Sequence, residues 1–208
     1  MGAVVPLGLV RARQPDDDDD GVGSRGERDR CVLDATLTEL GTKGYAGLSL
    51  AAVAQVAGTT RPAIYRRWPD KAALVVDAVA HLAEAEAPAV TGDPLTDLVA
   101  ELENFQHCIT EAGALPLAGL MLADDVEPAV REAYLERIVS PRRARLRGIL
   151  TTAVDAGQLS ADADLEIAGS FLTGSWYSVH IAGRPVPDNW ASRVATLVWT
   201  ACGGQPPA

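Results

Sequence analysis

Residues 49–71 read SLAAVAQVAGTTRPAIYRRWPDK, and this stretch decides the fold. Ser49 and Thr60 each precede a short run with apolar residues at helical spacing, as N-cap residues precede a helix. Gly58 separates the two runs and permits a tight turn. The stretch therefore predicts two short helices joined by a turn. They are expected at residues 50–57 and 61–67.

Helical spacing continues on both sides of this stretch. Gly44 follows a periodic segment at the place where a left-handed C-cap ends a helix. Alternating β-branched runs between turns are missing, so no sheet is expected. Pro141 should kink the longest helix because proline removes one backbone hydrogen bond. The sequence predicts an all-α fold of about nine helices, at residues 25–43, 50–57, 61–67, 70–86, 94–112, 115–123, 128–156, 162–182 and 188–203.

The charge of the chain is unevenly distributed. The net charge is −10, but residues 24–71 carry eight Lys or Arg against five acids, which gives +3. Residues 72–208 carry −10, and residues 1–23 carry −3 because of the run from Asp16 to Asp20. A local basic patch is what a nucleic-acid partner requires. We expect a disordered acidic tail (1–23), a DNA-binding domain (24–71) and a regulatory and dimerisation domain (72–208). A metal site at the Asp run is the weaker alternative, because consecutive acids on a flexible strand hold a metal ion poorly.

The second short helix has the composition of a major-groove reading helix. Packing its apolar face on the helix expected at residues 25–43 leaves Arg61, Arg66 and Arg67 facing outward. Lys71 lies in the first turn of the next helix, where a cation opposes the helix dipole at a cost of roughly 0.3–1 kcal/mol. A DNA phosphate docked at that helix end would remove this cost. The alternative is a Lys71 side chain that bends away into water.

Residues 49–71, preceded by Gly44-Tyr45, closely resemble the DNA-binding signature of the TetR/AcrR family, and the resemblance spans about residues 25–80. It implies that Arg61, Pro62 and Ala63 approach base edges. Phosphate contacts are implied for Ser49, Thr60, Tyr65 and Lys71, and either role for Arg66 and Arg67. Trp68 is expected in the core. Pro62 stands where many relatives have glycine, and proline disfavours helical geometry at Arg61, so the base contact of Arg61 is the least secure of the set.

The resemblance also implies a homodimer and a small-molecule effector. The apolar stripes of the last two helices predict an interface including Leu172, Trp190, Val194, Leu197 and Val198, with an ordinary intrachain core as the alternative. Effector-lining candidates are Phe105, His107, Met121, Trp176 and Tyr177, each of which could also be simple core. Few charges lie in these stretches, which favours an apolar or aromatic ligand. The basic run Arg142, Arg143, Arg145 and Arg147 is interpreted as a solvated face paired with acids.

These patterns indicate a DNA-binding transcriptional regulator: a homodimeric repressor that a small apolar or aromatic ligand releases from a double-stranded operator. One alternative is a small helical enzyme, but the chain has no Gly-rich phosphate loop, nucleophile elbow or metal-ligand spacing, so neither cofactor nor metal is expected. The other is a helical adaptor, which predicts Arg61, Arg66 and Arg67 paired with acids. No run of 18 apolar residues is present, so we expect a cytoplasmic protein without a membrane span.

Overall fold

The computed structural model describes residues 22–111, 115–121 and 127–205, and within these ranges every regular element is helical. Each of the nine expected helices is present, so the all-α prediction is confirmed. The longest of them is divided into three segments. The run from Asp16 to Asp20 lies outside the described residues. The elements are α1 (Val22–Gly47), α2 (Leu50–Val56), α3 (Arg61–Arg67), α4 (Lys71–Ala85), α5 (Pro94–Glu111), α6 (Leu115–Leu120), α7 (Pro128–Tyr134), the π-helical η1 (Leu135–Val139), α8 (Ser140–Asp155), α9 (Leu165–Ile181) and α10 (Trp190–Ala201).

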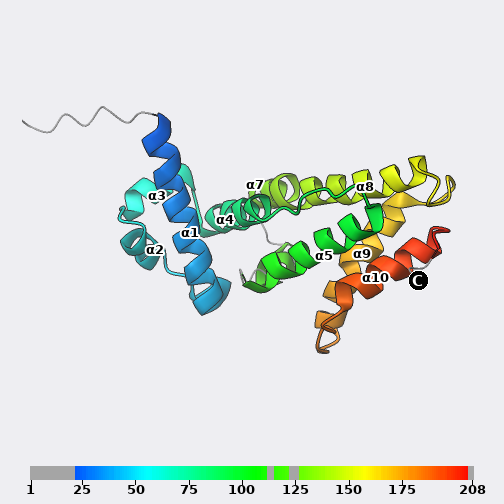
Figure 1. Ribbon diagram of the computed structural model, residues 1–208. Coiled ribbons are helices and arrows are strands. Elements are labelled where there is room, and N and C mark those ends of the chain that lie inside the picture. Colours follow the sequence, from blue (N-terminus) through cyan, green and yellow to red (C-terminus); the bar gives the residue numbers. More distant parts are fainter. Residues whose placement is uncertain (1–21, 112–114, 122–126, 206–208) are drawn as a thin grey trace, which may run out of the picture.

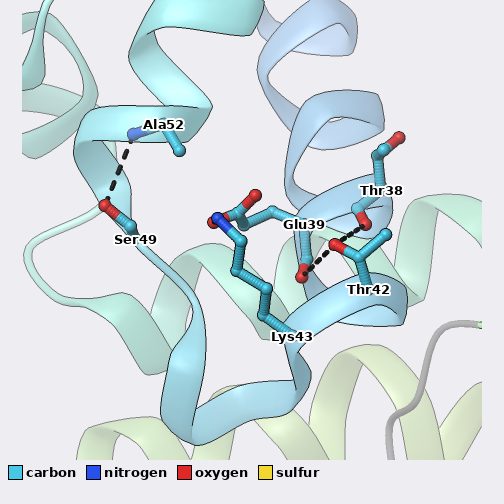
Figure 2. Close-up of polar contacts among 6 residues, drawn as sticks. All are labelled: Thr38, Glu39, Thr42, Lys43, Ser49 and Ala52. Atoms are coloured by element: carbon cyan, nitrogen blue, oxygen red, sulfur yellow. Dashed lines mark hydrogen bonds and ion pairs between the residues drawn. The ribbon is translucent and has the colours of Figure 1, made fainter.

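The first helices begin and end at the residues that the sequence indicates. Gly44 has φ 67° and ψ 173°, a conformation open essentially to glycine alone, and it ends the regular part of α1 without adopting the left-handed helical geometry of the expected cap. Gly58 has φ 64° in the turn between α2 and α3. The Ser49 hydroxyl accepts a hydrogen bond from the Ala52 N–H at the start of α2, as Figure 2 shows. Thr60 and Asp70 cap α3 and α4 in the same way, so the predicted N-caps are confirmed.

Two apolar cores hold the chain together. Helices α1–α3 gather at one end of the molecule, and α10 with the C-terminus lies toward the other (Figure 1). The first core joins residues of α1–α3, such as Leu40 and Ile64, to Leu74 and Val75 of α4. The second core is built from α5, α8, α9 and α10, and includes Leu172. Helix α4 therefore belongs structurally to the core of the N-terminal helices while it leads into the body.

The run from α7 to α8 contains the irregularity expected near Pro141. The Ser140 N–H donates to the carbonyl of Leu135, five residues back, which is the bonding pattern of a π-helix. Pro141 follows directly and has no N–H to donate, so the chain passes the proline with an enlarged turn just before it. This turn packs against α4. The proline thus places an irregular segment beside the helix that leads to the N-terminal unit.

Candidate nucleic-acid interface

Helix α3 presents a basic face outward and an apolar face inward. Ile64 is almost completely buried, and Trp68, which caps the C-terminal end of α3, is buried as expected. Arg61, Pro62 and Arg66 are exposed, as is Tyr65 at 43%. Ala63 is only partly exposed. The apolar residues therefore fix α3 on the first core, while its polar side chains point away from it.

The three arginines of α3 have different surroundings. The guanidinium carbon of Arg61 lies 5.9 Å from the centre of the Tyr65 ring. Arg67 forms an ion pair with Asp29 of α1 and lies 5.8 Å from the Trp68 ring. No acid among the described residues pairs with Arg61 or Arg66. The adaptor hypothesis requires acidic partners for all three arginines, and only Arg67 has one.

Lys71 has a local partner that the sequence did not reveal. Its ammonium group donates a hydrogen bond of 2.8 Å to the carbonyl of Tyr45, and it lies 4.6 Å from the centre of the Tyr45 ring. Burial, followed by the nearby Asp70 carboxylate, raises the pKa of the Tyr45 phenol, so this ring is uncharged at neutral pH. The end of α1 therefore compensates the cation at the start of α4, without requiring a phosphate there.

A small basic hollow lies between the N-terminal part of α1 and α3. Its volume is about 90 Å³, and arginines of both helices line it. Arg25 and Arg28 belong to the basic segment, but the sequence predicts no contact for them. No local pattern could place these two residues, because their position beside Arg66 depends on how α1 crosses α3. The lining residues are Arg25, Arg28, Asp29, Val32, Thr59, Ala63, Ile64, Arg66, Arg67 and Trp68.

A polar link joins the end of α3 to the body. The Trp68 indole N–H donates a 2.8 Å hydrogen bond to Asp77 of α4. The other oxygen of Asp77 pairs with Arg137 of η1 at 2.7 Å. Asp77 thus connects the reading helix, α4 and the π-helical turn through one carboxylate. The sequence carried no signal for this link, because its members are 9 and 60 residues apart.

The expected effector-lining residues are not all in one place. Phe105, Trp176 and Tyr177 meet in the second core, with ring centres 5.5–5.8 Å apart in edge-to-face contacts. Met121 belongs instead to the first core. His107 is exposed, and its Nε2 lies 3.1 Å from a carboxylate oxygen of Glu86. Three of the five candidates therefore form a cluster.

The second basic run departs from the expected solvated face at one position. Arg143 is exposed and pairs with Glu166, as that interpretation requires. The interpretation as a solvated face is wrong for Arg142, because its side chain is only 9% exposed and its guanidinium carbon lies 4.9 Å from the centre of the Phe105 ring. Helical rotation turns Arg142 inward, toward α5. Sequence spacing did not single out this position, because a charged residue is usually assigned to the outside.

The apolar stripes of α9 and α10 divide between the interior and the surface. Leu172, Trp190 and Val198 are buried within the chain, as the alternative of an intrachain core requires. Val194 is partly exposed, and Leu197 is 70% exposed. Val194 and Leu197 also line a groove of about 780 Å³. The large exposed apolar side chains of these two helices are Ile167, Phe171, Ile181 and Leu197.

The described residues restrict other chemistry. Among them, no helix is long and apolar enough to cross a lipid bilayer. The same residues contain no group of three or more His, Cys, Asp and Glu side chains that could hold a metal ion. Cys31 is exposed, Cys108 and Cys202 are buried, and all three are free thiols.

Comparisons with known proteins agree over both parts of the chain. Residues 32–78 match the family described as "Bacterial regulatory proteins, tetR family", and residues 88–198 match "Tetracyclin repressor-like, C-terminal domain". The HTH-type transcriptional regulator Rv1556 of Mycobacterium tuberculosis is 32% identical over 153 residues, or 71% of this chain and 73% of that protein. The DNA-binding transcriptional repressor TetR of Mycobacteroides abscessus is 28% identical over 82% of this chain and 92% of its own. The crystal structure of the TetR family regulator SCO0332 has a TM-score of 0.70 and 31% identity, and the match covers 84% of this chain and 97% of that one.

Proposed function

Because this chain belongs to the TetR family of bacterial transcriptional regulators, we propose that it is a homodimeric repressor that a small molecule releases from its operator. Residues 24–71 make the operator contacts, and residues 72–208 hold the effector and the second subunit. The protein acts in the cytoplasm, where bacterial DNA is found. The observation that carries this proposal is the exposed face of α3, where Arg61 and Arg66 have no acidic partner among the described residues.

Base contacts come from the outward side of α3. An arginine can donate two parallel hydrogen bonds to the major-groove edge of guanine, and Arg66 has the exposure for this role. Arg61 reaches the groove with Pro62 and Ala63 at the N-terminal end of the helix. Arg67 is held on the α1 side by Asp29, so it approaches phosphate only if that ion pair opens.

Phosphate contacts surround the reading helix. The hydroxyls of Ser49 and Thr60 accept hydrogen bonds from their own helices, which leaves each O–H free to donate to a phosphate oxygen. Tyr65 adds a third hydroxyl on the exposed face. Lys71 lies at the N-terminus of α4 and can share its ammonium group between the Tyr45 carbonyl and a phosphate.

The second subunit covers the exposed apolar face of α9 and α10. Phe171 and Leu197 are 65% and 70% exposed, and an exposed surface of this kind indicates an interaction site. A two-fold dimer lets two reading helices meet half-sites about 34–36 Å apart. Effector binding shifts the population toward a state in which this spacing no longer matches the groove.

Operator binding is tested with the full chain and the DNA upstream of its own gene, by fluorescence anisotropy at several salt concentrations. We expect Arg66→Ala to weaken binding by about 1–3 kcal/mol, or roughly 5–150-fold, and to relax specificity at one base pair. The matched control is Arg147→Ala, which removes an exposed arginine of α8 and should leave affinity unchanged. Lys71→Ala should weaken all sequences alike and reduce the salt slope. Absence of salt-sensitive binding to this DNA would refute the proposed function.

The dimer face is tested by sedimentation equilibrium of Phe171→Asp. We expect a monomer, because a carboxylate in a closed apolar interface loses its hydration without gaining a partner. Val90→Asp is the control, since Val90 is 82% exposed but lies in the loop before α5. If both variants remain dimers, the subunits meet elsewhere.

A further inference from the structure

The second core contains a group of charges that is not balanced. The Glu101 side chain is 2% exposed, and one of its oxygens accepts a 3.0 Å hydrogen bond from Nε of Arg145 and lies 2.9 Å from Nη2 of the same guanidinium group. The same oxygen lies 3.7 Å from Nε of Arg142, beyond hydrogen-bond distance. Two guanidinium groups therefore share one carboxylate, and only Arg145 is hydrogen-bonded to it. Within the described residues, this leaves one buried positive charge at Arg142 without a hydrogen-bonded counterion.

Two buried donors in this place have no acceptor. Among the described residues, neither Nε of Arg142 nor the indole nitrogen of Trp176 has a hydrogen-bond partner. Both side chains flank Phe105: the Arg142 guanidinium carbon is 4.9 Å from the centre of that ring, and the Trp176 ring centre is 5.7 Å from it. Buried polar groups in folded proteins are normally paired, so two unpaired donors around one ring indicate a missing acceptor.

Tyr177 of the cluster is hydrogen-bonded to a second phenol, that of Tyr134. Burial, followed by the charge of Tyr134 and a hydrogen bond with it, raises the pKa of Tyr177 well above its usual value. Burial likewise raises the pKa of Tyr134. Both rings are therefore neutral near pH 7, and because one O–H is used in the hydrogen bond between them, the pair has one O–H left to donate. Both residues are partly exposed, so the cluster is not sealed from solvent on this side.

We propose that the cluster of Arg142, Trp176 and Tyr177 around Phe105, with Tyr134 beside Tyr177, binds a small organic carboxylate with an aromatic or apolar body. This inference rests on the proposed function, because it names the chemical class of the effector. The carboxylate supplies an anion and acceptor lone pairs to a group of side chains that has donors in excess. The rings of Phe105, Trp176 and Tyr177 contact the apolar body. Arginine suits this role because its planar fork matches a carboxylate in two parallel hydrogen bonds.

A bound carboxylate also has a physical route to the reading helix. Arg142 lies three residues after the π-helical turn Leu135–Val139, within the same continuous helical run. Arg137 of that turn pairs with Asp77, which holds the indole of Trp68. A ligand that draws Arg142 toward itself therefore pulls on the segment that positions the end of α3.

The experiment measures binding of benzoate, phenylacetate, 1-naphthoate and octanoate, each beside its neutral amide, to the full-length protein by calorimetry. We expect at least one carboxylate to bind about ten-fold or more tightly than its amide, and to release operator DNA in the anisotropy assay. Arg142→Met should abolish this preference. Arg143→Met is the matched control, because Arg143 is the neighbouring but exposed arginine.

A second variant keeps the test independent of folding at position 142. Trp176→Phe removes only the indole donor and keeps an aromatic ring, so it should reduce the preference for carboxylate over amide without abolishing DNA binding. The inference is overturned if no carboxylate is preferred over its amide, which includes the case that none binds, or if Arg142→Met keeps the preference. If the carboxylate test fails but the unmodified protein binds its operator, only this inference is refuted. If the unmodified protein does not bind the operator, the proposed function itself is refuted.

Discussion

Arginines occupy opposite environments at the two ends of this molecule. Arg66 of the N-terminal unit is exposed and has no ion pair among the described residues, whereas Arg142 of the body is buried against an aromatic ring. The exposed arginine loses little free energy in water and is available to a large partner. The buried one is costly to keep and is useful only if something small compensates its charge. The difference separates the surface that we propose meets DNA from the core that we propose meets an effector.

The first prediction tests the buried charges and has the largest expected effect. Glu101→Gln leaves Arg142 and Arg145 without their shared carboxylate, and we expect a loss of about 3–5 kcal/mol in the free energy of unfolding, because breaking a buried pair strands a charge. Glu166→Gln is the control, since that pair with Arg143 is exposed and should change stability by about 0–1 kcal/mol. Urea denaturation measures both. Equal losses in the free energy of unfolding for the two variants would contradict the larger contribution that burial predicts for Glu101.

The second prediction concerns the loop that leads into the body. The Asp97 carboxylate accepts hydrogen bonds from the hydroxyl and N–H of Thr91 at 2.6 and 2.8 Å, and these bonds hold its pKa below the usual value. Because the folded-state pKa is depressed, this stabilisation is present above the unfolded pKa and is lost as pH falls through the folded pKa. Asp97→Asn should cost about 1–3 kcal/mol at pH 7. The difference between variant and unmodified protein should shrink below about pH 4.

The control for this pH dependence is Asp162→Asn, which changes an exposed acid in the loop before α9. Thermal unfolding is followed for all three proteins between pH 7 and pH 3. A loss at Asp97→Asn that stays constant across this range would contradict the role given to the charge of Asp97.

The third prediction addresses the link between the two regions. Asp77→Asn replaces one of two accepting oxygens with an amide donor, so either Trp68 or Arg137 loses its partner. We expect a loss of about 1–2 kcal/mol in stability and weaker coupling between effector and operator. Asp34→Asn is a suitable control, because Asp34 is largely exposed. Operator affinity with and without effector gives the coupling, and an unchanged ratio in Asp77→Asn would exclude this route.

The smallest expected effect is at the reading helix itself. Thr60→Ala removes the hydroxyl that accepts from the Ala63 N–H, and it should cost about 1 kcal/mol, as the loss of an N-cap does. Thr60→Ser keeps the oxygen and should behave like the unmodified protein. Denaturation and operator titration together separate the cap from a phosphate contact. If Thr60→Ala weakens operator binding without lowering stability, the hydroxyl serves DNA more than the helix.

The two regions also differ in how far the sequence predicts them. The N-terminal unit depends on local signals, such as Gly44 and the hydroxyls of Ser49 and Thr60, and these placed its helices correctly. The body depends on contacts between distant residues: Arg145 and Glu101 are 44 positions apart. No periodicity reveals such a pair. The same reason explains why the sequence indicated the apolar stripes of the last two helices but not their division between interior and surface.

The core beneath the reading helix has a consequence for exchanging modules between related regulators. Leu74, Val75, Val76 and Val79 of α4 complete the apolar cluster that holds Ile64, and Lys71 ties the start of α4 to the end of α1. A chimaera joined at residue 71 would leave the transplanted unit without part of its interior. A junction after α4 would keep that interior together. Asp77 would then have to pair with the segment of the other regulator that corresponds to η1. Recombination among such proteins should therefore preserve the first four helices as one heritable block.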